Sequence, residues 1–188
     1  EYFSILGCKL LCCLSYNEES RSTLVQVGVF KTLQDILLAH RQSHTVIEWV
    51  CRCLYCLVQD HPSNREILST TQMCQSLVDV GSKYREDVSL DMIKWFCRSI
   101  GNISFHCEST KDIFGQSGAC EVIISIMKQY SLTDIHIAES GSWALANLAY
   151  PNKHNQHTLR NLGLSNILVD NLRCHMKIYS IVQQICIC

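Results

Sequence analysis

The feature of this sequence that most limits its fold is an internal repeat with a period of about 45 residues. Four apolar residues spaced 44, 46 and 45 apart mark the successive copies, namely Leu24, Leu68, Phe114 and Leu159. Four positions after each of them stand Gly28, Gln72, Gly118 and Gly163. A period of this length predicts stacked units that bury a continuous core, rather than one closed globular domain.

Each copy reads as three helices joined by tight turns. In the clearest copy, residues 134–148 place an apolar stripe on one face of a helix, at Ile137, Gly141, Leu145 and Leu148. A short polar helix follows over 151–163, and we expect the closing Gly163 to adopt the left-handed C-cap conformation. Leucines four residues apart then predict a further helix over 164–172.

The same register predicts the boundaries of the units. We expect a single domain with a partial unit at 1–16, complete units at about 17–60, 61–106 and 107–150, and a partial unit at 151–188. The last segment, 177–188, is expected to begin another helix. Terminal repeats usually present a polar outer face, and neither end does so here. We therefore interpret the chain as a piece of a longer array.

The residues of the best-defined unit indicate a family. The segments GACEVIISIM at 118–127 and ESGSWALANLA at 139–149 resemble the helices of the armadillo repeat, in which a Trp-x-x-x-Asn pattern ends the third helix. The resemblance implies an all-α, right-handed α-solenoid of about four stacked three-helix repeats, open at both ends. The second copy departs most from the pattern, with Gln72 for a glycine and Gly81 for an apolar residue.

Cysteine usage points to a reducing compartment. The chain has 13 cysteines, and most of them fall on apolar helix faces, for example Cys8, Cys51, Cys97 and Cys120. Reduced cysteine behaves there as a small hydrophobic residue, which favours the cytoplasm or the nucleus. Cys51 and Cys53 would point about 200° apart on a helix, so we predict packing and neither a metal site nor a cofactor.

Several classes of function are disfavoured by the sequence. It contains no glycine-rich phosphate loop, no G-x-S-x-G and no H-E-x-x-H motif, so we predict that the protein is not an enzyme. The formal net charge of −1 disfavours a general nucleic-acid surface. No apolar run reaches the length of roughly 18 residues that a membrane span needs.

The family resemblance implies that the third helices line a concave groove. In arrays of the importin-α and β-catenin type, the asparagine of Trp-x-x-x-Asn binds the backbone of an extended peptide. That position holds Cys13, Cys56, Asn102 and Asn147 in successive copies. The tryptophan position holds Lys9, Arg52, Arg98 and Trp143, and one turn earlier stand Ile5, Glu48, Lys94 and Glu139. Repeated Trp/Asn pairs are absent, which disfavours binding of basic nuclear signals.

Two interpretations of these positions stay open. Cations at the tryptophan position would form a basic strip for an acidic partner, or they are an ordinary solvated face on which an arginine pairs with Glu48 or another nearby acid. Trp49 and Trp95 either pack between repeats or line the groove edge. The residues predicted to bind a partner are Lys9, Arg52, Lys94, Arg98, Asn102, Glu139, Trp143 and Asn147.

The function we predict is a protein–protein interaction module that holds an extended, partly acidic segment of a partner protein. Two alternatives belong to other classes. One is a structural component of a larger cytoskeletal or ciliary assembly, and the other is a regulator that docks a folded partner such as a small GTPase. The sequence does not separate the three.

Overall fold

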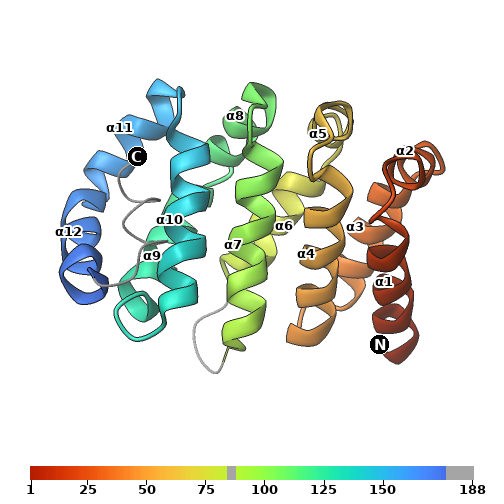
Figure 1. Ribbon diagram of the computed structural model, residues 1–188, viewed down its shortest axis with the longest axis horizontal. Helices are drawn as coiled ribbons and strands as arrows, with labels where there is room; N and C mark the ends of the chain where they lie inside the picture. The colour runs from red at the N-terminus through yellow and green to blue at the C-terminus, as the bar shows by residue number, and fades with distance from the viewer. Residues whose placement is uncertain (84–87, 177–188) are drawn as a thin grey trace.

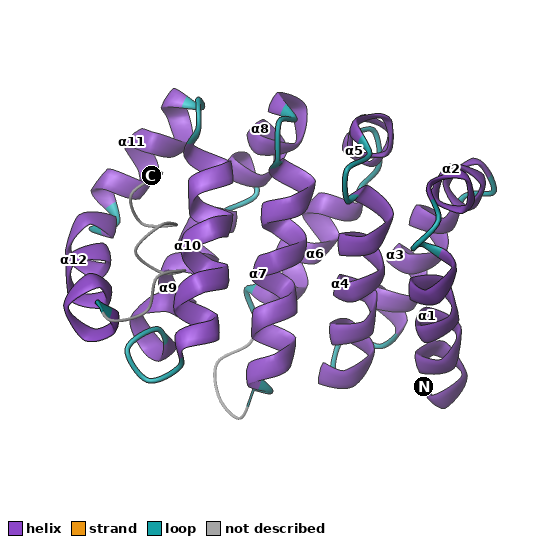
Figure 2. Ribbon diagram, viewed as in Figure 1, coloured by secondary structure: helices purple, strands orange, loops and turns teal. Residues whose placement is uncertain are grey.

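The computed structural model describes residues 1–83 and 88–176, and within them every regular element is an α-helix (Figure 2). The first helices of the repeats are short: α2 (Glu18–Gln26), α5 (Pro62–Ser69), α8 (Glu108–Gln116) and α11 (Lys153–Asn161). The second helices are α3 (Val29–Ala39), α6 (Met73–Gly81), α9 (Ala119–Tyr130) and α12 (Leu164–His175). The third helices are α1 (Tyr2–Leu14), α4 (His44–Val58), α7 (Leu90–Ser104) and α10 (Ile135–Ala149). The helix expected within 177–188 lies outside the described residues.

The helices stack as an all-α solenoid, as the sequence predicts. In Figure 1 the third helices α1, α4, α7 and α10 lie side by side in one layer, and each contacts the next. The first helices lie along the upper edge of this layer, and α3, α6 and α9 lie behind it. In the described part of the chain, no helix is both long and apolar enough to cross a membrane.

Glycines set the turn between the first and second helices in three of the four repeats. Gly28, Gly118 and Gly163 have φ values of 85°, 86° and 80°, the left-handed conformation that a side chain disfavours. The predicted conformation of Gly163 is therefore confirmed. Gln72 has φ −83° instead. There the Thr71 hydroxyl accepts a hydrogen bond from the Met73 N–H and donates one to the Leu68 carbonyl, so a different turn joins the helices.

Where the second helix packs against the third helix, the sizes of the two facing residues differ from repeat to repeat and compensate for each other. In the first complete repeat, the residues at the corresponding positions are Leu37 and Val50, and both are fully buried. In the next repeat the residues at these two positions are Gly81 and Phe96, and a Cβ atom on Gly81 would lie 2.4 Å from the Phe96 ring. In the third repeat the sizes are reversed, with Met127 filling the space beside Gly141. A large residue on one helix therefore meets a small one on the other, which explains the apparent defect at Gly81.

In three of the four first helices, α5, α8 and α11, a polar residue near the start binds the end of the preceding third helix. Its side chain donates a hydrogen bond of 2.7–3.0 Å to a backbone carbonyl at the last turn of that helix. The pairs are Asn64 with Leu57, Thr110 with Ile103, and Asn155 with Leu148. These carbonyls have no partner within their own helix, so the side chains satisfy groups that would otherwise be buried without a hydrogen bond.

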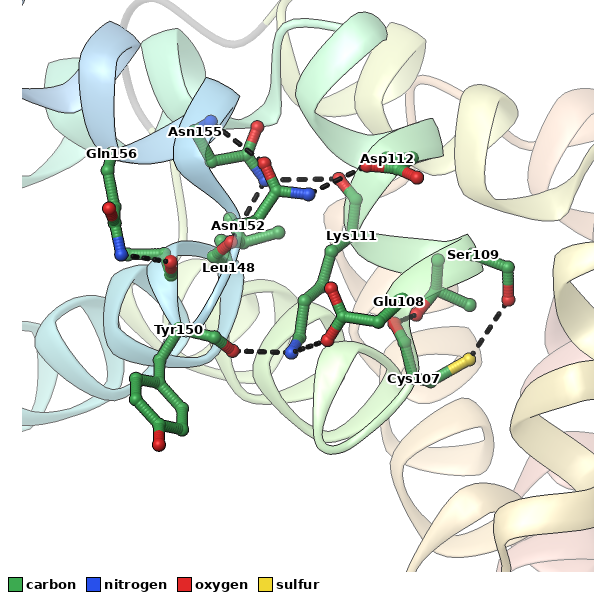
Figure 3. A network of polar contacts seen from close by, with 12 residues as sticks. Cys107, Glu108, Ser109, Lys111, Asp112, Leu148, Tyr150, Asn152, Asn155 and Gln156 are labelled. Atoms are coloured by element: carbon green, nitrogen blue, oxygen red, sulfur yellow. Dashed lines mark hydrogen bonds and ion pairs between the residues drawn. The ribbon is translucent and has the colours of Figure 1, made fainter.

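The next residue along the same first helix binds the other neighbouring third helix. Arg65, 3% exposed, donates from Nε to the Asn102 carbonyl at 3.1 Å. Lys111, 2% exposed, donates to the Tyr150 carbonyl and pairs with Glu108 at 2.6 Å (Figure 3). A cation at a helix C-terminus is favoured by the helix dipole. The first helices α5 and α8 therefore each hold the ends of two consecutive third helices, an arrangement we call the end clamp.

Candidate binding groove

Aromatic rings and cations alternate along the exposed face of the third helices. The Lys9 ammonium lies 5.1 Å from the ring centre of Trp49, and the Arg52 guanidinium lies 4.6 Å from the rings of both Trp49 and Trp95. The Arg98 guanidinium lies 5.3 Å from the Trp95 ring. We call these five residues the stacked row. They come from α1, α4 and α7, so the row crosses three repeats.

The stacked row exists because two tryptophans recur at the same register. Trp49 and Trp95 are 46 residues apart and therefore occupy equivalent positions on α4 and α7. Both side chains are half-buried, and the ring of each contacts cations of the row. Tyr55 adds an edge-to-face contact with Trp95, with ring centres 5.7 Å apart. Of the two roles considered for these tryptophans, the structure places them between neighbouring third helices, stacked with cations.

Ion pairs neutralise two of the four predicted cations. Arg52 donates two hydrogen bonds to Glu48, at 2.7 and 3.0 Å. Lys94 pairs with Asp91, and its ammonium lowers the pKa of that carboxyl. Lys9 and Arg98 form no ion pair with the described part of the chain. The positive charge available to a partner in this groove therefore comes from these two ends of the stacked row.

The two predicted asparagines differ in accessibility. Asn102 is 6% exposed, and its amide nitrogen donates to the Tyr55 carbonyl of the neighbouring third helix at 3.0 Å. Asn147 is half-buried and donates to the Trp143 carbonyl one turn earlier at 3.0 Å. Asn102 therefore joins α7 to α4, and Asn147 is the more accessible of the two amides.

A pocket of about 250 Å³ opens beside Arg98 on the same face. Its lining residues come from α4, α7 and α10, and they are Tyr55, Arg98, Glu139, Ser140 and Trp143. Three of the predicted partner-binding residues thus lie around one pocket. The indole of Trp143 packs against α7 where that helix has Gly101, because a Cβ atom on Gly101 would lie 2.6 Å from the ring.

A thiol cluster lies at the α1 end of the groove. The Cys12 and Cys53 sulfurs are 3.3 Å apart, and Cys53 donates a hydrogen bond to the Cys8 carbonyl at 3.0 Å. Hydrogen bonds from Cys53 and Cys56 lower the pKa of the Cys12 thiol. The described residues contain no group of three or more potential ligands arranged to hold a metal ion. The cysteines predicted to pack on apolar faces, Cys8, Cys51, Cys97 and Cys120, are fully buried.

Some residues that shape this face were not predicted. Tyr55 and Ser140 line the pocket, and the buried cations Arg65 and Lys111 fix the helix ends. The cations left a signal in the sequence, since Arg65 and Lys111 are 46 residues apart and follow the equivalent positions Asn64 and Thr110. Tyr55 and Ser140 left none, because a pocket depends on how neighbouring helices are spaced.

Comparisons with known proteins find similar structures and no similar sequence family. No family model and no curated protein matches the sequence. The structure is similar to a designed armadillo repeat protein in complex with the peptide (KR)4, with a TM-score of 0.81 and 18% identity over 96% of this chain and 71% of that chain. A second designed armadillo repeat protein gives a TM-score of 0.81 and 17% identity over 97% and 73% of the two chains.

An engineered protein of similar structure gives a TM-score of 0.82 and 16% identity over 98% of this chain and 72% of that chain. Computationally designed armadillo repeat proteins for modular peptide recognition give a TM-score of 0.72 and 16% identity over 93% and 72%. Identities this low relate the chains by fold and not by partner or function. The chain has the fold of an armadillo-repeat array, as the pattern of its third helices indicated.

Proposed function

We propose that this protein is a non-catalytic scaffold that binds an extended, acidic segment of a partner protein along its third helices. The observation that carries the proposal is the stacked row, in which aromatic rings hold Lys9, Arg52 and Arg98 along one face. Rings fix the positions of long cationic side chains, which reduces the entropy lost when a carboxylate binds.

The geometry of stacked helices suits an extended chain. Neighbouring packed helices lie roughly 8–10 Å apart, and an extended peptide advances about 3.3 Å per residue. One repeat therefore meets two or three residues of a peptide. Lys9 and Arg98 lie on helices separated by α4, so acidic residues about five or six positions apart would reach both of them.

The accessible amide of Asn147 supports the same binding mode. An amide donates and accepts at once, so it can bind a peptide unit whatever side chains the peptide carries. A designed armadillo repeat protein of the same fold was solved with the basic peptide (KR)4. In this chain the charge available on the stacked row has the same sign as that peptide, so we expect the opposite preference.

The partner is expected in a reducing compartment, the cytoplasm or the nucleus. The described cysteines are free thiols, and most of them are buried among apolar side chains of the core. Thiols in such numbers persist where glutathione and thioredoxin keep them reduced.

The test is a charge reversal at the two ends of the stacked row. A fluorescein-labelled peptide of alternating glutamate and serine is titrated with wild-type protein and with the Lys9→Glu/Arg98→Glu variant, at low and high salt. We expect wild-type binding that weakens with salt, and at least a tenfold loss in the variant, on the order of the coupling of close charge pairs. Arg52 is left unchanged, because Glu48 and two rings hold it.

The matched control reverses the same number of charges on the second helices, with Lys31→Glu/Lys128→Glu. Both lysines are exposed on α3 and α9, away from the stacked row. Equal losses in the two double variants would show a general charge effect and would contradict the proposed groove. Preferential binding of an alternating lysine and serine peptide would contradict it as well.

A further inference from the structure

The tryptophans that stack with cations occur on α4 and α7 and do not continue onto α10. Trp49 and Trp95 occupy equivalent positions on α4 and α7. The equivalent position on α10, 45 residues after Trp95, is Ser140. Its hydroxyl donates to the His136 carbonyl at 2.7 Å and projects no ring toward α7. The helix layer continues here, and the pattern of rings does not.

This change leaves Arg98 in a different environment from Arg52. Arg52 lies between two indole rings, each 4.6 Å away, and is paired with Glu48. Arg98 stacks on Trp95 alone, makes no ion pair with a described residue, and lines the pocket of about 250 Å³ next to Ser140. The pocket therefore lies on the side of Arg98 where a second indole ring would enclose the guanidinium, as the two rings enclose that of Arg52.

The lining of the pocket favours an uncharged flat ring. It contains one cation, Arg98, and one anion, Glu139, so the charges of the lining balance and give a charged side chain of either sign no net attraction. Tyr55 and Trp143 supply aromatic walls. A guanidinium attracts the face of a ring, and a phenol or indole can also donate a hydrogen bond to a carboxylate. A cavity of roughly 150 Å³ holds a benzene molecule, so this one has room for a larger ring.

We propose that this pocket binds an aromatic side chain of the partner segment, tyrosine or tryptophan before phenylalanine, stacked on Arg98. This inference rests on the proposed function and adds a specificity determinant to it. The recognised segment is then an extended acidic chain that carries one aromatic residue at a fixed position. Glu139 and Ser140 provide the polar groups that a phenol O–H or an indole N–H meets in the pocket.

The test compares peptides that differ in one side chain. The alternating glutamate and serine peptide is made with tryptophan, cyclohexylalanine or alanine at one position, which is moved along the peptide in a series. Affinities are measured by fluorescence anisotropy. At one position we expect tryptophan to bind about tenfold tighter than alanine, and cyclohexylalanine to fall clearly below tryptophan because it lacks a π face.

Two variants test whether the higher affinity of the tryptophan peptide arises in the pocket. Ser140→Trp restores the ring that the register lacks and fills the site, so the ratio of tryptophan-peptide to alanine-peptide affinity should fall to about one. Arg98→Met removes the cation while keeping an apolar stem, and it should lower the ratio to that of cyclohexylalanine over alanine. Thermal unfolding of both variants checks that they are folded. A wild-type ratio of one at every position, or a full ratio in Ser140→Trp, would overturn the inference.

A separate probe distinguishes failure of the pocket from failure of the groove. N-acetyl-tryptophanamide at millimolar concentration is followed by NMR at the Arg98 side chain and the Trp143 indole. If the alanine peptide binds but the ratio is one, the proposed function stands and the pocket inference is wrong. If neither peptide binds, the proposed function is wrong. Shifts from the probe that are absent in Ser140→Trp then support an aromatic site, and their absence overturns it.

Discussion

Gly81 of α6 lies against the ring of Phe96 of α7, so closely that a Cβ atom on Gly81 would sit 2.4 Å from the Phe96 Cζ atom. Both residues are buried. The corresponding residues of the first complete repeat are Leu37 and Val50, which are closer to each other in size and both fully buried. The pair is therefore complementary, and neither residue can be changed alone without cost.

We predict that Gly81→Leu destabilises the protein by about 2–3 kcal/mol, since the added side chain overlaps the Phe96 ring and forces it to shift. The double variant Gly81→Leu/Phe96→Val copies the pair of the first complete repeat, and it should recover at least half of that loss. Urea unfolding followed by circular dichroism measures both. Gly7→Ala in α1 is the control, because nothing lies within 4 Å of its added Cβ and the helix gains propensity. Equal losses in the single and double variants would refute the complementarity.

The buried ammonium of Lys111 should contribute more to stability than an exposed one. Lys111→Met removes hydrogen bonds to Glu108 and to the Tyr150 carbonyl, and leaves that carbonyl without a donor. We expect a loss of about 2 kcal/mol in the free energy of unfolding. Lys31→Met breaks an exposed pair with Asp35 and should cost about 0.5 kcal/mol or less. Similar effects in the two variants would show that Lys111 is not part of a clamp.

Replacement of Arg52 by lysine tests the double stacking. A lysine keeps the charge near Glu48, but it lacks the flat guanidinium that two indole rings enclose. We expect a loss of about 1 kcal/mol and a changed tryptophan emission spectrum, because Trp49 and Trp95 lose their shared neighbour. Arg160→Lys, at an exposed site on α11, is the matched control and should leave both quantities unchanged. An unchanged spectrum in Arg52→Lys would argue against the stack.

Buried thiols predict that stability falls at alkaline pH. Burial raises the pKa of Cys51, Cys74 and Cys97 to about 12, whereas the ordinary value is 9.0. The folded chain therefore keeps these protons where the unfolded chain releases them. Their contribution is fully present below pH 9.0 and is lost as the pH rises toward 12, at about 1.4 kcal/mol per thiol and pH unit.

Urea unfolding at a series of pH values above 9.0 measures this slope. Cys51→Val/Cys97→Val removes two of the thiols and should make the slope shallower by their share, whatever the change in stability at neutral pH. A slope that does not depend on these cysteines would assign the alkaline loss to other groups. Cys13 is exposed, and Cys13→Val serves as the control for loss of a thiol outside the core.

The sequence predicted the helices better than the groove. The register of Leu68, Phe114 and Leu159 reflects buried positions that recur from repeat to repeat, and periodicity detects such positions directly. Gly81 looked like a defect because its compensating residue, Phe96, lies on another helix. A pattern along one helix does not reveal a volume shared between two.

The cations of the groove were predicted from their register, and their environment was not. Register places Arg52 and Arg98 at equivalent positions, but ring stacking depends on the distance between α4 and α7. The pairing of Arg52 with Glu48 had remained one of two open interpretations, since residues four apart on a helix are neighbours. That these residues bind a partner is a prediction.

The end clamp has a consequence for selectivity. Asn64 and Arg65 hold the last turns of α4 and α7, while the stacked row crosses the middle of these helices. The interval between Arg52 and Arg98 is thus supported by hydrogen bonds at the helix ends, outside the stacked row. If the protein binds an acidic segment as proposed, we expect it to distinguish partners by the spacing of their acidic residues as well as by their charge.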